Sequence, residues 1–214
     1  MQLHTYFRSS AAYRVRIALG LKGLDWQAHF VHLVKEGGQH HSAAYKALNP
    51  MGLVPTFEQD DFVLNQSLAI IEYLDEQYPT PALLPGDAQA RAHIRALAYD
   101  VACDIHPINN LRVLKYLEQH LHLDAEQRKQ WYVHWVATGL EAFEKQLAAH
   151  AQSGDFCYGH TPTLADICLV PQVFNAHRFG YSTDHLPRLN TAVQACSQLA
   201  AFIQAEPANQ PDAD

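Results

Sequence analysis

Three prolines between residues 79 and 85 separate two parts of the chain whose apolar residues follow different patterns. Before them, short runs of β-branched and aromatic residues alternate with helical patterns, whereas from residue 88 the helical spacing is nearly continuous. Proline clusters are typical of linkers, because proline cannot continue a helix or donate a hydrogen bond within a sheet. The sequence therefore predicts two domains, residues 1–82 and residues 88–214.

The predicted order of elements in residues 1–82 is β-α-β, a polar loop, and then β-β-α. This order is typical of a compact α/β domain of the thioredoxin type, and the loop could contain a further helix. Ser67 is predicted to be the N-cap of the last helix, because it precedes a run of apolar residues at helical spacing. The predicted strands are residues 3–7, 26–33, 54–57 and 62–64, and the first helix is predicted over residues 14–21.

The second part of the chain is predicted to be an all-helical bundle. Pro107 is expected to bend its helix, and Thr163 and Asp166 have the spacing of a capping box, so Asp166 is interpreted as structural rather than catalytic. Residues 207–214 are expected to form an extended tail. The predicted helices are residues 88–120, 125–150, 163–178 and 188–204.

Charge and composition restrict the possible partners and the location of the protein. The chain has 15 basic and 22 acidic side chains, a net charge of -7, which argues against nucleic acid but leaves room for a small anion held by local arginines. Its four cysteines form no CxxC pair and no zinc-type cluster, so we expect free thiols and no metal. Neither a signal peptide nor a membrane-spanning run is recognisable, and we expect a cytoplasmic protein.

Ser9 and Ser10 lie between a predicted strand and a predicted helix. Backbone N–H groups at a helix N-terminus stabilise anions, and a thiolate is such an anion. The alternative is that a serine only caps the helix, and the spacing alone favours this alternative.

Two later segments also allow a ligand-binding and a structural interpretation. Pro55 opens a β run, where a cis peptide bond could turn the backbone of Val54 toward a ligand, although a trans edge-strand proline is the commoner case. Gln66 and Ser67 could hold a carboxylate at a helix start, and a simple N-cap is equally compatible with the sequence.

Polar residues also interrupt the helical patterns of the second part. Helical spacing brings His106, Asn110 and Asn109 toward one face of the helix, and Arg112 lies further round it. These residues could line a ligand site, and the alternative interpretation is a buried polar network whose members satisfy one another. Arg178 could be an ordinary surface charge near a helix end. The other histidines lack a metal-type arrangement and are mostly expected to be solvated, including His40, His41, His120 and His122.

Taken in order, these segments resemble the zeta-class glutathione transferases over nearly the whole chain. Each motif is weak by itself, but their order and spacing are specific. The matching segments are residues 7–19 (FRSSAAYRVRIAL), 47–50 (ALNP), 53–55 (LVP), 66–74 (QSLAIIEYL), 163–166 (TLAD), 169–173 (LVPQV), 175–179 (NAHRF) and 210–212 (QPD).

The resemblance implies the glutathione transferase architecture, a thioredoxin-like N-terminal domain followed by an all-α domain, and a homodimer. It further implies catalysis by Ser9 and Ser10, and recognition of a small dicarboxylic keto acid by arginines. The implied glutathione-binding residues are Ser9, Ser10, Ala11, His40, Val54, Gln66, Ser67, His106 and Asn110, and the implied substrate-binding residues are Arg8, Arg112 and Arg178.

The implied reaction is the glutathione-dependent isomerisation of maleylacetoacetate to fumarylacetoacetate in phenylalanine and tyrosine breakdown. The alternatives are a maleylpyruvate isomerase of gentisate-type degradation, a general transferase or dehalogenase, and a non-catalytic binding module, against which the intact serines and arginines argue. The chain departs from the family at Ala11, where many members have cysteine, and at His106, where many have glutamine. Arg112 adds a cation that not all members have, and in this respect the chain resembles the bacterial isomerases.

Overall fold

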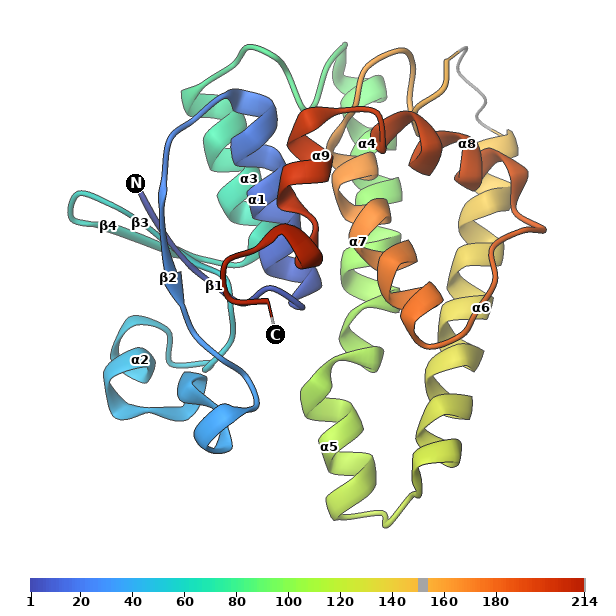
Figure 1. The fold of residues 1–214 in the computed structure, drawn as a ribbon. Coiled ribbons are helices and arrows are strands. Elements are labelled where there is room, and N and C mark those ends of the chain that lie inside the picture. Colours follow the sequence, from blue (N-terminus) through green and yellow to red (C-terminus); the bar gives the residue numbers. More distant parts are fainter. Residues whose placement is uncertain (150–153, 214) are drawn as a thin grey trace. The chain divides into compact units, whose positions relative to one another are not determined.

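The computed structural model describes residues 1–149 and 154–213 (Figure 1). It comprises two compact units, of which one contains Met1–Leu83 and the segment from Ser197 onward, and the other contains Leu84–Cys196. Within the described residues, no helix is both long enough and apolar enough to cross a lipid bilayer.

The first unit contains a four-stranded sheet in the order β2-β1-β3-β4. Strand β1 (Gln2–Thr5) pairs in parallel with β2 (Gln27–Phe30) and antiparallel with β3 (Thr56–Gln59), which pairs antiparallel with β4 (Phe62–Asn65). Helices α1 (Ser10–Lys22) and α3 (Ser67–Gln77) pack against each other, and α2 (Ala43–Leu48) lies apart from them in Figure 1. The predicted thioredoxin-type order is confirmed, and α2 is the further helix that the polar loop could contain.

Helix α1 begins four residues earlier than its apolar pattern predicted and ends one residue later. It stops at Gly23, whose φ of 64° is a left-handed conformation that glycine adopts without a Cβ clash. The N–H groups of Gly23 and Leu24 then bond to the carbonyls of Gly20 and Leu19, at 3.1 and 3.0 Å. These bonds satisfy carbonyls that have no partner inside the helix.

The C-terminal segment differs from the prediction. The expected helix over residues 188–204 is divided into α8 (Pro187–Cys196) and α9 (Ala200–Ala205), because Leu199 has extended backbone angles. Helix α9 packs against α1, so the chain after Ser197 belongs to the first unit and not to the helical one. Residues 207–213 are not an extended tail, since they begin with a 3₁₀ turn (η5, Pro207–Asn209) whose Pro207 is buried.

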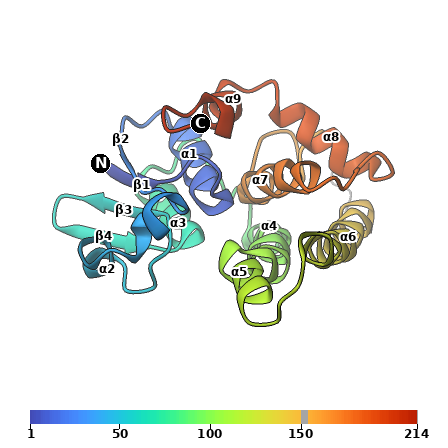
Figure 2. The ribbon, with the colours of Figure 1, turned by 60° about the horizontal axis from the view of Figure 1, so that its bottom comes forward.

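The second unit is helical, as predicted, with α4 (Ala88–Tyr99), α6 (Ala125–Ala149) and α7 (Leu164–Arg178) running as a bundle (Figures 1 and 2). Residue 150, which was expected to end the helix of α6, lies outside the described residues. The predicted capping box of α7 is confirmed, because the N–H of Thr163 donates to the Asp166 carboxylate at 2.8 Å. Asp166 is fully buried, and burial raises its pKa.

The expected helix over residues 88–120 is interrupted rather than bent. Helix α4 passes into a π-helix (η3, Asp100–Ile105), which is followed by a 3₁₀ turn (η4, Pro107–Asn109) and by α5 (Leu111–Gln119). Pro107 has no N–H to continue the helical ladder, and Asn110 then takes extended backbone angles as the N-cap of α5. The interruption contains His106, Asn109 and Asn110, and Arg112 follows in the first turn of α5.

Candidate functional site

The N-terminus of α1 holds both candidate serines. Ser9 is the N-cap, and its Oγ accepts a hydrogen bond from the N–H of Ala12 at 3.2 Å. Ser10 is the first helical residue and is buried, while Ala11 behind it is half-buried. A hydroxyl that accepts one bond can still donate its own proton, so capping by Ser9 is compatible with binding an anion. No acidic side chain lies in the first turn to oppose an anion.

A tight turn leads from β1 into this helix. The N–H of Ser9 donates to the carbonyl of Tyr6 at 3.0 Å, and the buried Arg16 donates to the carbonyls of Tyr6 and Phe7 at 3.4 and 3.1 Å. Burial lowers the pKa of Arg16 to about 10, an effect that nearby Tyr13 and Asp212 oppose. Arg8 is exposed, with its guanidinium 4.7 Å from the centre of the Phe7 ring.

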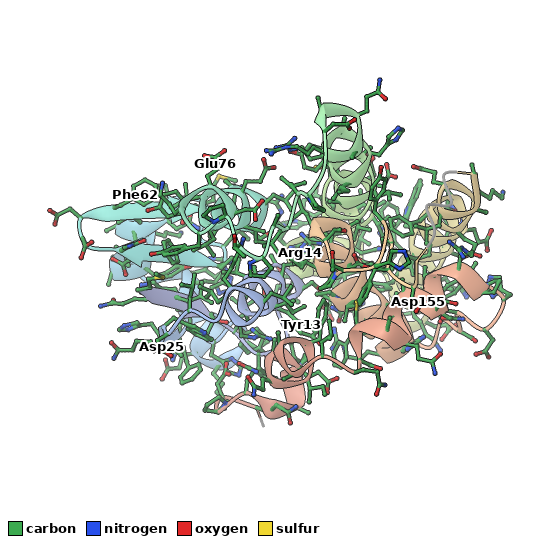
Figure 3. All side chains as sticks on the ribbon, turned by 90° about the horizontal axis from the view of Figure 1, so that it is seen from above. Tyr13, Arg14, Asp25, Phe62, Glu76 and Asp155 are labelled. Carbon is green, nitrogen blue, oxygen red and sulfur yellow. The ribbon has the colours of Figure 1, made fainter. Side chains whose placement is uncertain are left out.

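A second helix N-terminus in the same unit contains Gln66 and Ser67. The prediction that Ser67 is the N-cap is wrong, because Gln66 takes that position and Ser67 is the first helical residue. Ser67 is buried, and Arg14, labelled in Figure 3, donates from Nη1 to its Oγ at 3.4 Å. Gln66 has a φ of 74°, a conformation that costs free energy in a residue other than glycine and that clusters at functional sites.

Val54 and His40 complete the candidate residues of the first unit. The Val54–Pro55 peptide bond is cis rather than the commoner trans form, and Val54 is buried. His40 is buried rather than solvated, with its ring centre 3.8 Å from that of the exposed His41. Its loop can close because Gly38 has a φ of 104° and lacks the Cβ that would overlap the His40 ring.

In the second unit, the interruption before α5 brings His106 and Asn110 together. The Asn110 Nδ2 lies 3.5 Å from His106 Nε2, and the Asn110 Oδ1 accepts from the N–H of Arg112 at 3.1 Å. Asn109 is not in this group, because it is buried and donates to the carbonyl of Tyr132 at 3.4 Å. Arg112 is exposed in the first turn of α5, where its cation and the helix N-terminus both favour an anion.

Arg178 ends α7 and is exposed. Its Nε donates to Asn175 Oδ1 at 3.0 Å, and its guanidinium lies 4.8 Å from the centre of the Phe179 ring. Phe179 in turn stacks on the buried Tyr132, with ring centres 3.7 Å apart. Burial raises the pKa of Tyr132 to about 12, although the charge of Arg178 and a hydrogen bond with Gln172 oppose the shift. Tyr132 therefore supports this cluster as a neutral phenol.

Comparison with known proteins places this geometry in a family. Residues 3–82 match the family model described as "Glutathione S-transferase, N-terminal domain". The chain is 50% identical over 213 residues to the maleylacetoacetate isomerase of Pseudomonas aeruginosa, covering 99% of this chain and 98% of that protein. It is 48% identical to the solved holo structure of a maleyl pyruvate isomerase described as a bacterial glutathione S-transferase of the zeta class, with a TM-score of 0.97 and full coverage of both chains.

The chain belongs to the zeta class of the glutathione S-transferase family. A further similar structure is the maleylacetoacetate isomerase of Anaeromyxobacter dehalogenans 2CP-1, solved with glutathione in its active site. The two chains are 41% identical, and their match covers 100% of this chain and 97% of the Anaeromyxobacter chain with a TM-score of 0.88.

Several supporting residues of this zeta-class chain were missed by the sequence analysis. Asn175 lies three positions before Arg178, which is one helical turn, so the pair could have been found from its spacing. Tyr132 carries no such signal, because it lies on α6 and its contacts with Gln172 and Phe179 reach across to α7 and the residue that follows it. All four cysteines are free, with Cys103 exposed and the other three buried. Among the described residues, no group of His, Cys, Asp or Glu is arranged to hold a metal ion.

Proposed function

We propose that this protein is a glutathione-dependent cis–trans isomerase that converts maleylacetoacetate to fumarylacetoacetate. The observation that carries the proposal is the pair Ser9 and Ser10 at the N-terminus of α1. The chain that presents this pair is 50% identical to the maleylacetoacetate isomerase of Pseudomonas aeruginosa. A helix N-terminus with donor hydroxyls suits a thiolate better than a neutral thiol.

The groups of the first unit fit the tripeptide glutathione. Ser9 or Ser10 donates to the sulfur, and the backbone of Val54 pairs with the cysteinyl part. Ser67 and the strained Gln66 hold the γ-glutamyl end, where a buried hydroxyl and helix N–H groups suit a carboxylate. The remaining glutathione contacts come from Ala11, His40, His106 and Asn110.

Isomerisation requires that the alkene bond become a single bond for long enough to rotate. Glutathione, when bound, supplies the thiolate that adds reversibly to the alkene carbon conjugated with the carbonyl. The serine hydroxyl keeps the sulfur ionised by donating to it. Arg178, Arg112 and Arg8 hold the carboxylates of the substrate and stabilise negative charge that develops on its carbonyl oxygen.

Maleylpyruvate is the second candidate substrate. Its support is the 48% identity and the TM-score of 0.97 with the solved maleyl pyruvate isomerase, nearly the same identity as with the maleylacetoacetate enzyme. The two substrates share the cis alkene, the conjugated carbonyl and the terminal carboxylates, so the same groups serve both.

A rate comparison on the two substrates tests this proposal. We expect isomerisation of maleylacetoacetate to require glutathione and to have a higher kcat/KM than that of maleylpyruvate. A higher kcat/KM for maleylpyruvate would reassign the substrate, and equal rates without glutathione would contradict the mechanism.

We also propose that the protein is a cytoplasmic homodimer, as the family resemblance implies. Its free cysteines suit a reducing compartment. Sedimentation at micromolar concentration should give twice the chain mass of 24.1 kDa, and a single species at the chain mass would refute the dimer.

A further inference from the structure

The C-terminal residues 206–213 form a folded strap on the first unit. The Asn209 side chain donates to the carbonyl of Ile203 at 2.6 Å, and the Gln210 side chain donates to the carbonyls of Gln204 and Glu206 at 2.7 and 3.0 Å. The N–H of Ala213 then donates to the carbonyl of Gln210 at 3.0 Å. Two of these bonds satisfy carbonyls near the end of α9, and the others hold the strap together, so the strap has a defined shape.

The end of the strap contacts the turn that leads into α1. Asp212 Oδ2 accepts a hydrogen bond from the N–H of Phe7 at 3.0 Å, and Ala213 packs against the buried cluster that contains Tyr6 and Phe7. The second oxygen, Asp212 Oδ1, is buried and has no hydrogen-bond partner in the described part of the chain. Phe7 is buried and lies two residues before Ser9.

Two side chains together fix the backbone of this turn. Arg16 bonds to the carbonyls of Tyr6 and Phe7, and Asp212 bonds to the N–H of Phe7. The same Tyr6 carbonyl accepts the N–H of Ser9 at 3.0 Å, which links the position of the turn to that of the serine. Arg16 also donates to the carbonyl of Ala205 at 3.0 and 3.2 Å, and so joins the turn to the end of α9.

We propose that Asp212 is a positioning residue for the reaction, which holds the Tyr6–Ser9 turn so that the serine hydroxyls meet the glutathione sulfur. The inference rests on the proposed function and extends it to a residue far from the serines in sequence. Without the carboxylate, the N–H of the buried Phe7 lacks its acceptor, and the turn can relax toward other backbone angles. A displacement of about 1 Å at a reacting group is enough to lower a rate by up to about 100-fold.

The experiment compares Asp212→Ala, Asp212→Asn and the matched control Asn209→Ala in the full chain. Asn209→Ala removes a hydrogen bond inside the same strap but no contact with the turn. The readouts are kcat, KM for the dicarboxylate, and the pKa of the glutathione thiol in its complex, followed by the ultraviolet absorbance of the thiolate.

We expect Asp212→Ala to lower kcat about 10-fold and to raise the thiol pKa, with the dicarboxylate KM within about 2-fold of wild type. Asp212→Asn retains an oxygen acceptor of lower strength and should lower kcat about 3-fold. Asn209→Ala should keep the wild-type kcat and thiol pKa. The direction of the change in the thiol pKa distinguishes the two explanations. Loss of a nearby negative charge alone would lower the thiol pKa, whereas a displaced serine hydroxyl would raise it.

A thiol pKa in Asp212→Ala that is unchanged or lowered overturns the proposal, whatever happens to kcat. If that variant does not fold, wild-type kcat and thiol pKa in Asp212→Asn overturn it, and a lower kcat with a raised thiol pKa supports it. The thiol pKa requires only that glutathione bind. A wild-type protein without isomerase activity therefore refutes the proposed function, while the pKa series still decides the role of Asp212.

Discussion

The two units present their candidate ligand groups in different ways. In the first unit, Ser10, Ser67 and Val54 are buried. Ser10 and Ser67 offer short hydroxyls at helix N-termini, and Val54 offers its backbone groups just before β3. In the second unit, Arg112 and Arg178 are exposed and reach out from helix ends on long side chains. The first arrangement depends on the backbone fold and the second on individual side chains.

The two kinds of ligand group differ in how easily a substitution can remove them. A site made of backbone groups moves only if a turn or helix moves, whereas an exposed arginine is lost by one substitution with little effect on the core. We therefore expect chemistry on the glutathione thiolate to be retained among relatives while substrate preference varies. The nearly equal identity to isomerases of two different keto acids fits this expectation.

The largest expected effect is on the substrate side. Arg178→Met should lower kcat/KM for the dicarboxylate by about 10- to 100-fold, because one charge-assisted contact contributes roughly 1.5–3 kcal/mol. The glutathione Kd should change less than about 2-fold. Arg188→Met, on α8 of the same unit, is the control and should leave both constants unchanged. Wild-type kcat/KM in Arg178→Met would remove this arginine from the substrate site.

The next effect concerns the serines. Ser9→Ala or Ser10→Ala should lower kcat by roughly 10-fold or more, because a hydrogen bond to the thiolate is lost. Ser9→Ala also removes a helix cap worth about 1 kcal/mol, so stability must be measured in parallel. Asp87→Ala, which removes the cap of α4, is the matched control for that loss. Wild-type turnover in both single variants and in the double variant would show that the serines only cap the helix.

A smaller effect tests how Arg178 is held. Asn175→Ala removes the acceptor of the Arg178 Nε–H and should raise KM for the dicarboxylate by about 3- to 5-fold, with a smaller change in kcat. Asn175→Asp retains the acceptor and should restore most of the affinity. If both variants have the same KM, the contact does not orient the arginine.

The smallest expected effect is on the free energy of unfolding, and it comes from Asp100 in the π-helix of the second unit. Burial raises the pKa of Asp100, and Asp104 adds to the shift while a hydrogen bond from Gln146 opposes it. Since the folded state binds the proton more tightly than the unfolded state, stability falls as pH rises through the folded-state pKa. Asp100→Asn removes this penalty and should be more stable than wild type at pH 7.

Urea denaturation at several pH values measures that difference. The gain in Asp100→Asn should shrink as the pH falls below the ordinary aspartate pKa of 3.8, where both states of the wild type are protonated. A gain that is independent of pH would indicate a packing effect rather than a buried charge.

Much of the first unit could be predicted because its signals are local. The strand runs, the helical pattern of residues 14–21 and the serines before α1 each depend on neighbouring residues. The N-cap of α3 was assigned one residue late, because a non-glycine residue with positive φ, such as Gln66, has no reliable sequence signal. The burial of His40 depends on Gly38 and on the loop closing around the ring.

The contacts that sequence analysis missed join distant parts of the chain. The bond between Phe7 and Asp212 spans 205 positions, and the bonds between Arg16 and Ala205 span 189. Helical periodicity correctly predicted α9 as a helix but carries no information about which unit it packs against. The Gln210–Asp212 motif was recognised only as part of a resemblance, and its contact with the turn requires the three-dimensional fold.

The proposed mechanism depends on a division of roles, in which the first unit supplies most of the glutathione contacts and Arg112 and Arg178 of the second unit supply most of the contacts with the dicarboxylate. It is tested most directly by measuring glutathione Kd and dicarboxylate KM in Arg178→Met and in Ser67→Ala side by side. We expect Arg178→Met to change only the substrate constant and Ser67→Ala to weaken glutathione by about 10-fold with the substrate constant nearly unchanged. The reverse pattern, in which Arg178→Met weakens glutathione and leaves the dicarboxylate unaffected, would contradict the claim.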